Sequence, residues 1–492
     1  MHGRTASKPK AAFNYRRTYS SMINRILIRT KVVQMLYSYL LTRTDFKILQ
    51  QPESTSQDAV FAYKVYKDLL LMLVQLTNGK KTPKMPVAIT VDKKMLRSRA
   101  GAALAADDTI KGMLFSGDND LPVIAPEMQR LADNIAQSAV YKDYSKKRSP
   151  EIALEVSMWI SVFATTVKRD RAFVAAIRSL DGFTNKGYEQ AFTLFEKTLT
   201  SYRDASLGYA TAKKDLALSL DKAYNLYCDI FCLMANLTKA QAENIENAKA
   251  KFLATQDELN PNMRFADNSF VAKLLESPSF APYYEKNAIG WTSDFSLIQD
   301  LLKEITASQY YADYMEAEST DFELDCEVWR NLLRNVLFRS DALEEAIENE
   351  SVFWNDDLNI MGTFVLKTIR YAQSHPDEPI SLLEKYKDEE DATFGAELFD
   401  AAIGHRYEYR ELIERFINNQ NWEIERIPFM DIVIMITAIT ELVTYPGIPV
   451  AVTMNEYVEL ANNYSTPKSG QFVNGILHSV ATYLKNNNVI YK

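Results

Sequence analysis

The sequence predicts an all-α fold, and three observations support this prediction. Apolar residues recur at the helical spacing of three to four positions through most of the 492 residues, whereas almost no segment alternates with the period of two typical of strands. The stretch Ile424 to Val443 is apolar nearly all round, so we expect a buried central helix that Tyr445-Pro446-Gly447 ends. With 47% hydrophobic and 24% charged residues the chain should fold, and its length favours two or more modules.

The amino-terminal part divides into an arm and a group of helices. Residues 1–21 mix Ser, Thr, Lys, Arg and Ala without a helical stripe, so we expect a flexible basic arm. Residues 22–77 are assigned to a first helical group. Its first helix presents one broad apolar face, formed by Ile28, Val32, Met35, Leu36 and Tyr39.

Two segments further along the chain resemble each other. Ala, Tyr, Tyr, Asp, Leu and Thr fall at identical offsets in residues 62–77 and 223–238, which suggests a duplicated helix, although short apolar helices also recur by chance. Between them, turn-forming residues open a segment that has helical spacing over residues 126–141 and 151–167. We interpret residues 78–218 as an inserted helical module.

The remaining chain is also predicted to be helical. Residues 219–345 continue the helical pattern, residues 346–486 form a carboxyl-terminal domain, and residues 487–492 are a tail. Within that domain, Thr453 and Glu456 have the spacing of a capping box, which would satisfy unpaired amides at a helix start.

A last helix is predicted behind a cap and a first-turn proline at Ser465, Thr466 and Pro467. Its first turn carries Lys468 and Gln471 in place of the carboxylates that a helix dipole favours. Polar donors therefore point outward from an amide-rich helix end, which suits a phosphate.

Charge is distributed unevenly along the chain. The first 44 residues contain nine basic side chains and no acidic one, so the remainder has 56 − 9 = 47 basic against 64 acidic side chains, a balance of −17. One basic end on an acidic body predicts local attraction to polyanions. Arg25, Arg29 and Lys31 belong to this basic end, and their alternative interpretation is ordinary: they solvate a helix start or pair with the acidic body.

No constellation of residues favours an enzyme. The chain lacks a glycine-rich phosphate or dinucleotide loop, and none of its four histidines lies at metal-ligand spacing from another ligand. Cys228 and Cys232 lie four positions apart on an apolar helix and are expected in the core. We therefore expect no catalytic residue, metal or cofactor. Three cysteines, no signal-peptide core and no apolar run of roughly 18 to 20 residues favour the cytoplasm and no membrane.

Two separated motifs carry a resemblance to a known family. Met454-Asn455-Glu456 followed by Phe472-Val473-Asn474-Gly475 resembles the closing helices of the NusB transcription antitermination family, and Ile28 to Tyr39 resembles the first helix of that family. The resemblance implies two three-helix bundles, here enlarged by the inserted helices. Some ribosomal RNA cytosine methyltransferases carry a NusB-like domain, but this chain lacks their catalytic Rossmann-type half.

The resemblance also implies a function. Family members bind the boxA element of ribosomal RNA leaders together with the ribosomal protein NusE, and they assemble with RNA polymerase to suppress premature termination. The RNA-binding residues expected here are Arg25, Arg29, Lys31, Lys468, Gln471 and Phe472. Tyr37 and Glu441 match family positions that face the partner protein.

An alternative function remains open, in which the chain is a helical scaffold that has lost RNA binding. Guanidinium groups held against internal carboxylates, far from Lys468, would contradict the RNA-binding surface proposed from the sequence.

Overall fold

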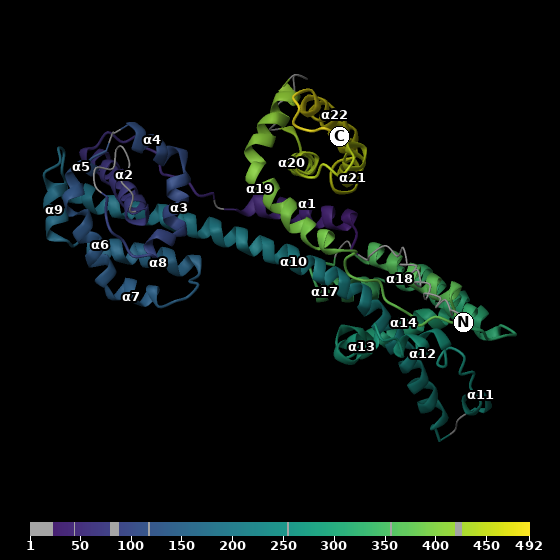
Figure 1. The fold of residues 1–492 in the computed structure, drawn as a ribbon. Helices are drawn as coiled ribbons and strands as arrows, with labels where there is room; N and C mark the ends of the chain where they lie inside the picture. Colours follow the sequence, from purple (N-terminus) through teal and green to yellow (C-terminus); the bar gives the residue numbers. More distant parts are fainter. Residues whose placement is uncertain are drawn as a thin grey trace, which may run out of the picture. The chain divides into compact units, whose positions relative to one another are not determined.

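The computed structural model describes residues 23–43, 45–78, 88–116, 119–252, 255–354, 357–418 and 426–492. The all-α prediction is confirmed, because helices and turns but no strands occur in these ranges (Figure 1). None of the helices they contain is long and apolar enough to cross a bilayer.

The chain divides into two compact units, which we describe separately. The central unit comprises residues 38–213, and the terminal unit comprises Met1–Tyr37 with Lys214–Lys492. The sequence analysis had grouped residues 22–77 together, whereas helix α2 (Gln57–Asn78) lies in the central unit.

The central unit packs around α2. Its helices after α2 are α3 (Arg99–Ala106), α4 (Asp108–Ser116), α5 (Leu121–Ile124), α6 (Met128–Gln137), α7 (Ala139–Ser145), α8 (Ile152–Val162), α9 (Arg171–Arg178) and α10 (Asn185–Lys249) as far as Lys213. Most of α2 is buried, and α3 approaches it closely at Gly101, where an added Cβ would lie only 2.1 Å from Thr77 Oγ1. A glycine is therefore required at this contact.

Over the residues that the structure describes, the terminal unit contains α1 (Arg25–Thr42) up to Tyr37, the second part of α10 and the helices α11 to α22. These are α11 (Gln256–Leu259), α12 (Ser269–Leu275), α13 (Ala281–Asn287), α14 (Phe295–Ala307), α15 (Gln309–Glu316), α16 (Phe322–Asn335), α17 (Asp341–Glu350), α18 (Leu358–Ser374), α19 (Glu389–Asn418), α20 (Phe429–Thr444), α21 (Val450–Tyr464) and α22 (Ser469–Asn486).

Helix α20 is the buried centre of the carboxyl-terminal helices, as its apolar sequence predicts. Every residue from Asp431 to Leu442 is buried, and α19, α21 and α22 pack around it (Figure 1). The helix ends at Thr444, directly before the predicted stop signal. Helix α1 packs closely against α19, because an added Cβ at Gly395 would lie 2.9 Å from Ile28 Cγ2.

The two segments that resemble each other in sequence make matching contacts. The hydroxyl of Tyr66 accepts a hydrogen bond from a backbone amide and lies 2.7 Å from Thr198 Oγ1. The hydroxyl of Tyr227 accepts one from another backbone amide and lies 2.8 Å from Thr368 Oγ1. The similarity therefore includes side-chain function as well as apolar spacing.

The repeat is much longer than these two segments. Residues 95–202 of the central unit correspond without a gap to residues 265–372 of the terminal unit, at a constant separation of 265 − 95 = 170 positions. Trp159 and Trp329 are equivalent and fully buried, and α8 and α16 begin at equivalent residues. Other identical pairs are Ser138 with Ser308, Tyr141 with Tyr311, Tyr144 with Tyr314 and Ile177 with Ile347. The two units thus each contain one copy of the same helical arrangement.

Candidate nucleic-acid interface

Arg29 lies in the interior of the terminal unit. Its Nε and Nη2 donate to the two carboxylate oxygens of Glu441 at 2.7 and 2.9 Å, and both side chains are almost completely buried. Thr453 and Tyr457 donate their hydroxyls to the same carboxylate at 2.8 and 3.1 Å. Burial opposes the charge of Arg29, but the hydrogen bonds and charge of Glu441 outweigh this effect and raise the pKa of Arg29.

The Glu441 network corrects two expectations. Thr453 lies inside α21, which begins at Val450, so it does not form the predicted capping box with Glu456. Its hydroxyl instead satisfies the buried carboxylate of Glu441. Because Glu441 is fully buried, its predicted contact with a partner protein is not available in this structure.

Lys31 is also buried. Its ammonium group lies 2.7 Å from a carboxylate oxygen of Asp357 and donates to the carbonyl of Phe353 at 3.0 Å. Arg29 and Lys31 therefore follow the ordinary interpretation, in which cations pair with internal carboxylates. The sequence-based assignment of these two residues to an RNA-binding surface is wrong for this structure, because neither charge reaches the surface.

Arg25 is the most accessible of the three cations. Its guanidinium bonds Asp391 and Glu390 of α19, each at 2.7 Å, and lies 5.0 Å from the ring centre of Phe394. The side chain keeps 28% of its surface exposed. Asp391 is buried but Glu390 is exposed, so these ion pairs are partly exposed, and exposed ion pairs contribute little stability.

The cations of α1 and the start of α22 lie at different levels of the bundle. Arg29 is anchored to Glu441, whereas Ser469 at the start of α22 donates to Asp431 at 2.7 Å. These two carboxylates lie ten positions apart on α20, which corresponds to about 15 Å along the helix axis. Arg29 and Lys468 therefore do not form one continuous surface.

Tyr37 lies farther along α1. It is half-buried, and its ring packs against Phe429 with 5.6 Å between ring centres. Phe429 is the first residue of α20, so α1 runs antiparallel to α20 from Glu441 back to its start. Tyr37 thus lies at the same level of α20 as the start of α22.

The turn between α21 and α22 exposes polar side chains. Lys468 and Gln471 are exposed and Phe472 is half-buried, and we call the surface formed by these three residues the α22 corner. Helix α22 begins at Ser469, two residues later than the predicted first-turn proline at Pro467.

The first turn of α22 carries no acidic residue, as expected from the sequence, but a carboxylate of α20 lies behind this helix start. Asp431 is buried, accepts the hydroxyl of Ser469 through Oδ2, and its Oδ1 has no hydrogen-bond partner among the residues described. This carboxylate interacts favourably with the backbone amides at the start of α22, which reduces their attraction for an external phosphate. An anion at the corner would therefore depend mainly on Lys468.

The corner also includes a residue that the sequence analysis did not select. Asn474, within the Phe472 to Gly475 motif, is exposed one turn after Gly470. Its position in the motif was the available signal, but an amide on a helix can face either the core or solvent. Groups of three or more side chains able to bind a metal are absent from the part of the chain that the structure describes.

Over the described residues these features define an all-helical protein with a buried central helix and an exposed polar corner at the start of α22. The NusB family model matches residues 363–482, from the middle of α18 to the last turns of α22. The chain belongs to the NusB family.

Three relatives illustrate the match, and each is named transcription antitermination protein NusB. The protein from Dictyoglomus thermophilum is 41% identical over 87 residues, which are 18% of this chain and 59% of the relative. The protein from Salinibacter ruber is 35% identical over 123 residues, 24% of this chain and 75% of the relative. The protein from Koribacter versatilis is 31% identical over 128 residues, 26% of this chain and 86% of the relative.

The extent of the matches is limited. The chain spans about three fifths of the length of the first of these relatives, and no solved structure matches it. The central unit lies outside the family match at residues 363–482.

Proposed function

We propose that this chain is a cytoplasmic, non-enzymatic RNA-binding factor in transcription antitermination that binds a boxA-type element of ribosomal RNA leaders. It acts together with NusE and RNA polymerase and needs no cofactor. Family membership supports the general role, because the relatives carry this name. The observation that carries the proposal is that the matched residues fold into α19–α22 and present the α22 corner to solvent.

The RNA-binding surface is smaller than the sequence suggests. It comprises Lys468, Gln471 and the exposed edge of Phe472, with Arg25 as a separate contact on α1. Arg29 and Lys31 contribute indirectly, because their ion pairs hold α1 in place. Tyr37, which packs against Phe429 at the start of α20, is the remaining candidate for contact with NusE.

The corner is tested with a double variant and a control on the same helix. Lys468→Ala with Gln471→Ala removes the exposed donors, and we expect about tenfold weaker binding to leader RNA in the presence of NusE. Lys485→Ala removes one exposed charge from the last turn of α22 and should bind as the wild type does. The readout is a gel shift on a leader RNA and a scrambled control.

The outcomes separate two functions. Equal affinity of the double variant and of Lys485→Ala would reject the corner as the RNA site. The second candidate, a helical scaffold, is favoured by the large part of the chain outside the family match. A pull-down that recovers NusE and leader RNA together supports antitermination, whereas recovery of neither supports the scaffold.

A further inference from the structure

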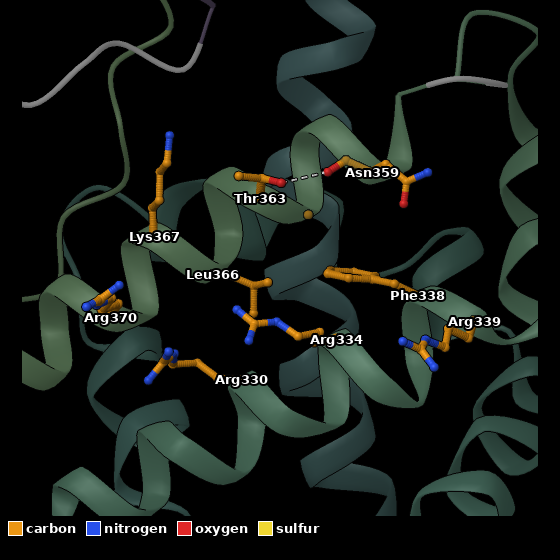
Figure 2. A pocket seen from close by; sticks show the side chains of 10 residues that line it. Arg330, Arg334, Phe338, Arg339, Asn359, Thr363, Leu366, Lys367 and Arg370 are labelled. Carbon is orange, nitrogen blue, oxygen red and sulfur yellow. Dashed lines mark hydrogen bonds between the residues drawn. The ribbon is translucent and has the colours of Figure 1, made fainter.

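A strongly basic groove lies between α16 and α18 of the terminal unit. Its cavity has a volume of about 440 Å³, and five of its lining residues are cationic. The cations come from α16, from the short 3-10 helix Leu337–Arg339 and from α18: they are Arg330, Arg334, Arg339, Lys367 and Arg370. Figure 2 shows Arg330 and Arg334 on α16 and Arg370 on α18 reaching toward the space between the two helices. We call this surface the α16–α18 groove.

The positive charges of the groove lack carboxylate partners in the part of the chain that the structure describes. None of the five cations has a carboxylate partner among the described residues, and the lining contains no acidic residue. All except Arg330 are exposed. By contrast, Arg410 elsewhere in the same unit pairs with Glu414 at 3.0 Å. Five adjacent unpaired cations repel one another, so they are costly unless an anion binds.

Arg330 provides a second, independent observation. Its Nη1 donates to the side chain of Gln373 at 2.9 Å, which fixes the guanidinium against α18. Its Nε is buried and has no hydrogen-bond partner among the residues that the structure describes. A guanidinium nitrogen left without an acceptor costs free energy, which an oxygen-rich ligand in the groove would recover.

The repeat shows that an excess of positive charge is not needed for this helix packing. The equivalent helices of the central unit, α8 and the first part of α10, pack through the stacked rings of Phe163 and Phe195, 4.3 Å apart. Their residues at the five cationic positions, 170 positions earlier, are Ile160, Ala164, Arg169, Lys197 and Thr200. Glu189 and Glu196 occupy two further groove positions there. The central copy thus keeps two of the five cations, and its two glutamates balance them, whereas the terminal copy carries five cations and no acidic residue at the groove positions.

The dimensions of the groove favour an extended anion. Its lining residues on α18 run from Asn359 to Arg370, eleven positions that correspond to about 16 Å along the helix. A single phosphate would contact two or three of the cations, whereas charges spread over this length match successive phosphates of a strand. Phe338 packs edgewise against Gly362, where a Cβ would lie 2.6 Å from its ring, so it forms the floor and is not free to stack on a base.

We propose that the α16–α18 groove binds the phosphate backbone of RNA without reading its sequence. The identification of the anion as RNA rests on the proposed function, whereas the anion site itself rests on the geometry of the groove. Arginine donates in a fixed fork that matches phosphate oxygens, so Arg334 and Arg370 bind adjacent phosphates from opposite sides of the groove.

The test uses the full chain and a labelled twelve-nucleotide oligouridine, which lacks any boxA sequence. Arg334→Gln with Arg370→Gln removes two groove charges, and Arg148→Gln with Arg171→Gln removes the same charge from exposed positions of the central unit. Fluorescence anisotropy between 50 and 200 mM salt gives affinity and salt dependence. We expect the groove variant to bind at least tenfold more weakly, with a salt slope smaller by about 1.4, and the control to bind as the wild type does.

Each outcome decides the proposal. Equal binding by groove variant and control, or no oligouridine binding by the wild type at 50 mM salt, overturns it. Binding of pyrophosphate at the groove without binding of oligouridine also overturns it, in favour of a small phosphorylated ligand. A groove variant that keeps leader RNA while Lys468→Ala loses it would reject the groove and leave the proposed function intact, and the reverse result would reject the corner alone.

Discussion

Replacing Arg29 tests whether this residue is a structural anchor or an RNA contact. Arg29→Met keeps the length of the side chain but leaves the carboxylate of Glu441 buried without its cation. Two charges about 4 Å apart interact by about 4 kcal/mol at an effective dielectric constant of 20, and breaking a buried pair typically costs about 3 to 5 kcal/mol. We therefore expect Arg29→Met to lower the free energy of unfolding of the terminal unit by about this amount.

A second substitution should restore much of the loss. Glu441→Gln in the Arg29→Met background removes the unpaired charge, and the amide oxygen can still accept the hydroxyls of Thr453 and Tyr457. We expect the double variant to lie within about 2 kcal/mol of the wild type, so that the two substitutions are strongly non-additive.

The assay is urea unfolding followed by circular dichroism. The chain contains two units, so two transitions are fitted, and only the transition of the terminal unit should shift. Arg25→Met is the matched control, because its ion pairs are partly exposed and its loss should cost at most about 1 kcal/mol. If Arg29→Met unfolds at the wild-type urea concentration but loses RNA affinity, the anchor interpretation is refuted and Arg29 is an RNA contact.

Three further predictions concern the units themselves. Burial raises the pKa of Asp68 to about 7, so the contribution of Asp68 to the stability of the folded wild type falls as pH rises from about 4 to about 7. We therefore expect Asp68→Asn to be more stable than the wild type at pH 8, by up to about 4 kcal/mol, and equally stable near pH 4. Thermal melts measure the difference, and a difference that does not depend on pH would contradict this prediction. Gly101→Ala should destabilise the central unit by about 1 to 3 kcal/mol, because the added methyl group meets the buried side chain of Thr77. Urea unfolding measures this loss, and an unchanged unfolding midpoint would show that α2 and α3 can move apart without cost. Tyr66→Phe and Tyr227→Phe should each lower the free energy of unfolding by about 1 to 3 kcal/mol, because each removes a hydroxyl that is hydrogen-bonded in the interior. The two substitutions should shift different unfolding transitions, one for each unit. Shifts in the same transition would contradict equivalent roles in the two units.

Much of the fold could be predicted from the sequence because the relevant signals are local. Helical spacing predicted the helices of both units, and the apolar circumference of α20 predicted its burial. The family was identified from short motifs at α1 and at α21–α22, and the comparisons confirm it. The similarity of residues 62–77 and 223–238 indicated a repeat. Its full length becomes visible only when residues from 95 onward are compared with residues 170 positions later.

The candidate site was predicted less completely. Lys468 and Gln471 are both exposed: Lys468 is the N-cap residue of α22 and Gln471 lies in its first turn. The sequence contains a pattern that could have indicated the basic groove, although the net charge of the chain is negative. Arg330 and Arg334 lie one helical turn apart, and so do Lys367 and Arg370. Each pair alone is typical of a solvated helix face, and only the packing of α16 against α18 brings them together.

The sequence by itself determined the all-helical fold, the buried central helix and the family, since hydrophobic periodicity and short motifs act over a few turns of chain. The tertiary structure alone decided which charges are available to a ligand. Arg29 meets Glu441 across 412 residues, and no local pattern can specify a partner at that distance. Burial and pairing turned the expected RNA contacts Arg29 and Lys31 into internal anchors, whereas Arg334, Lys367 and Arg370 remained exposed and without carboxylate partners among the described residues.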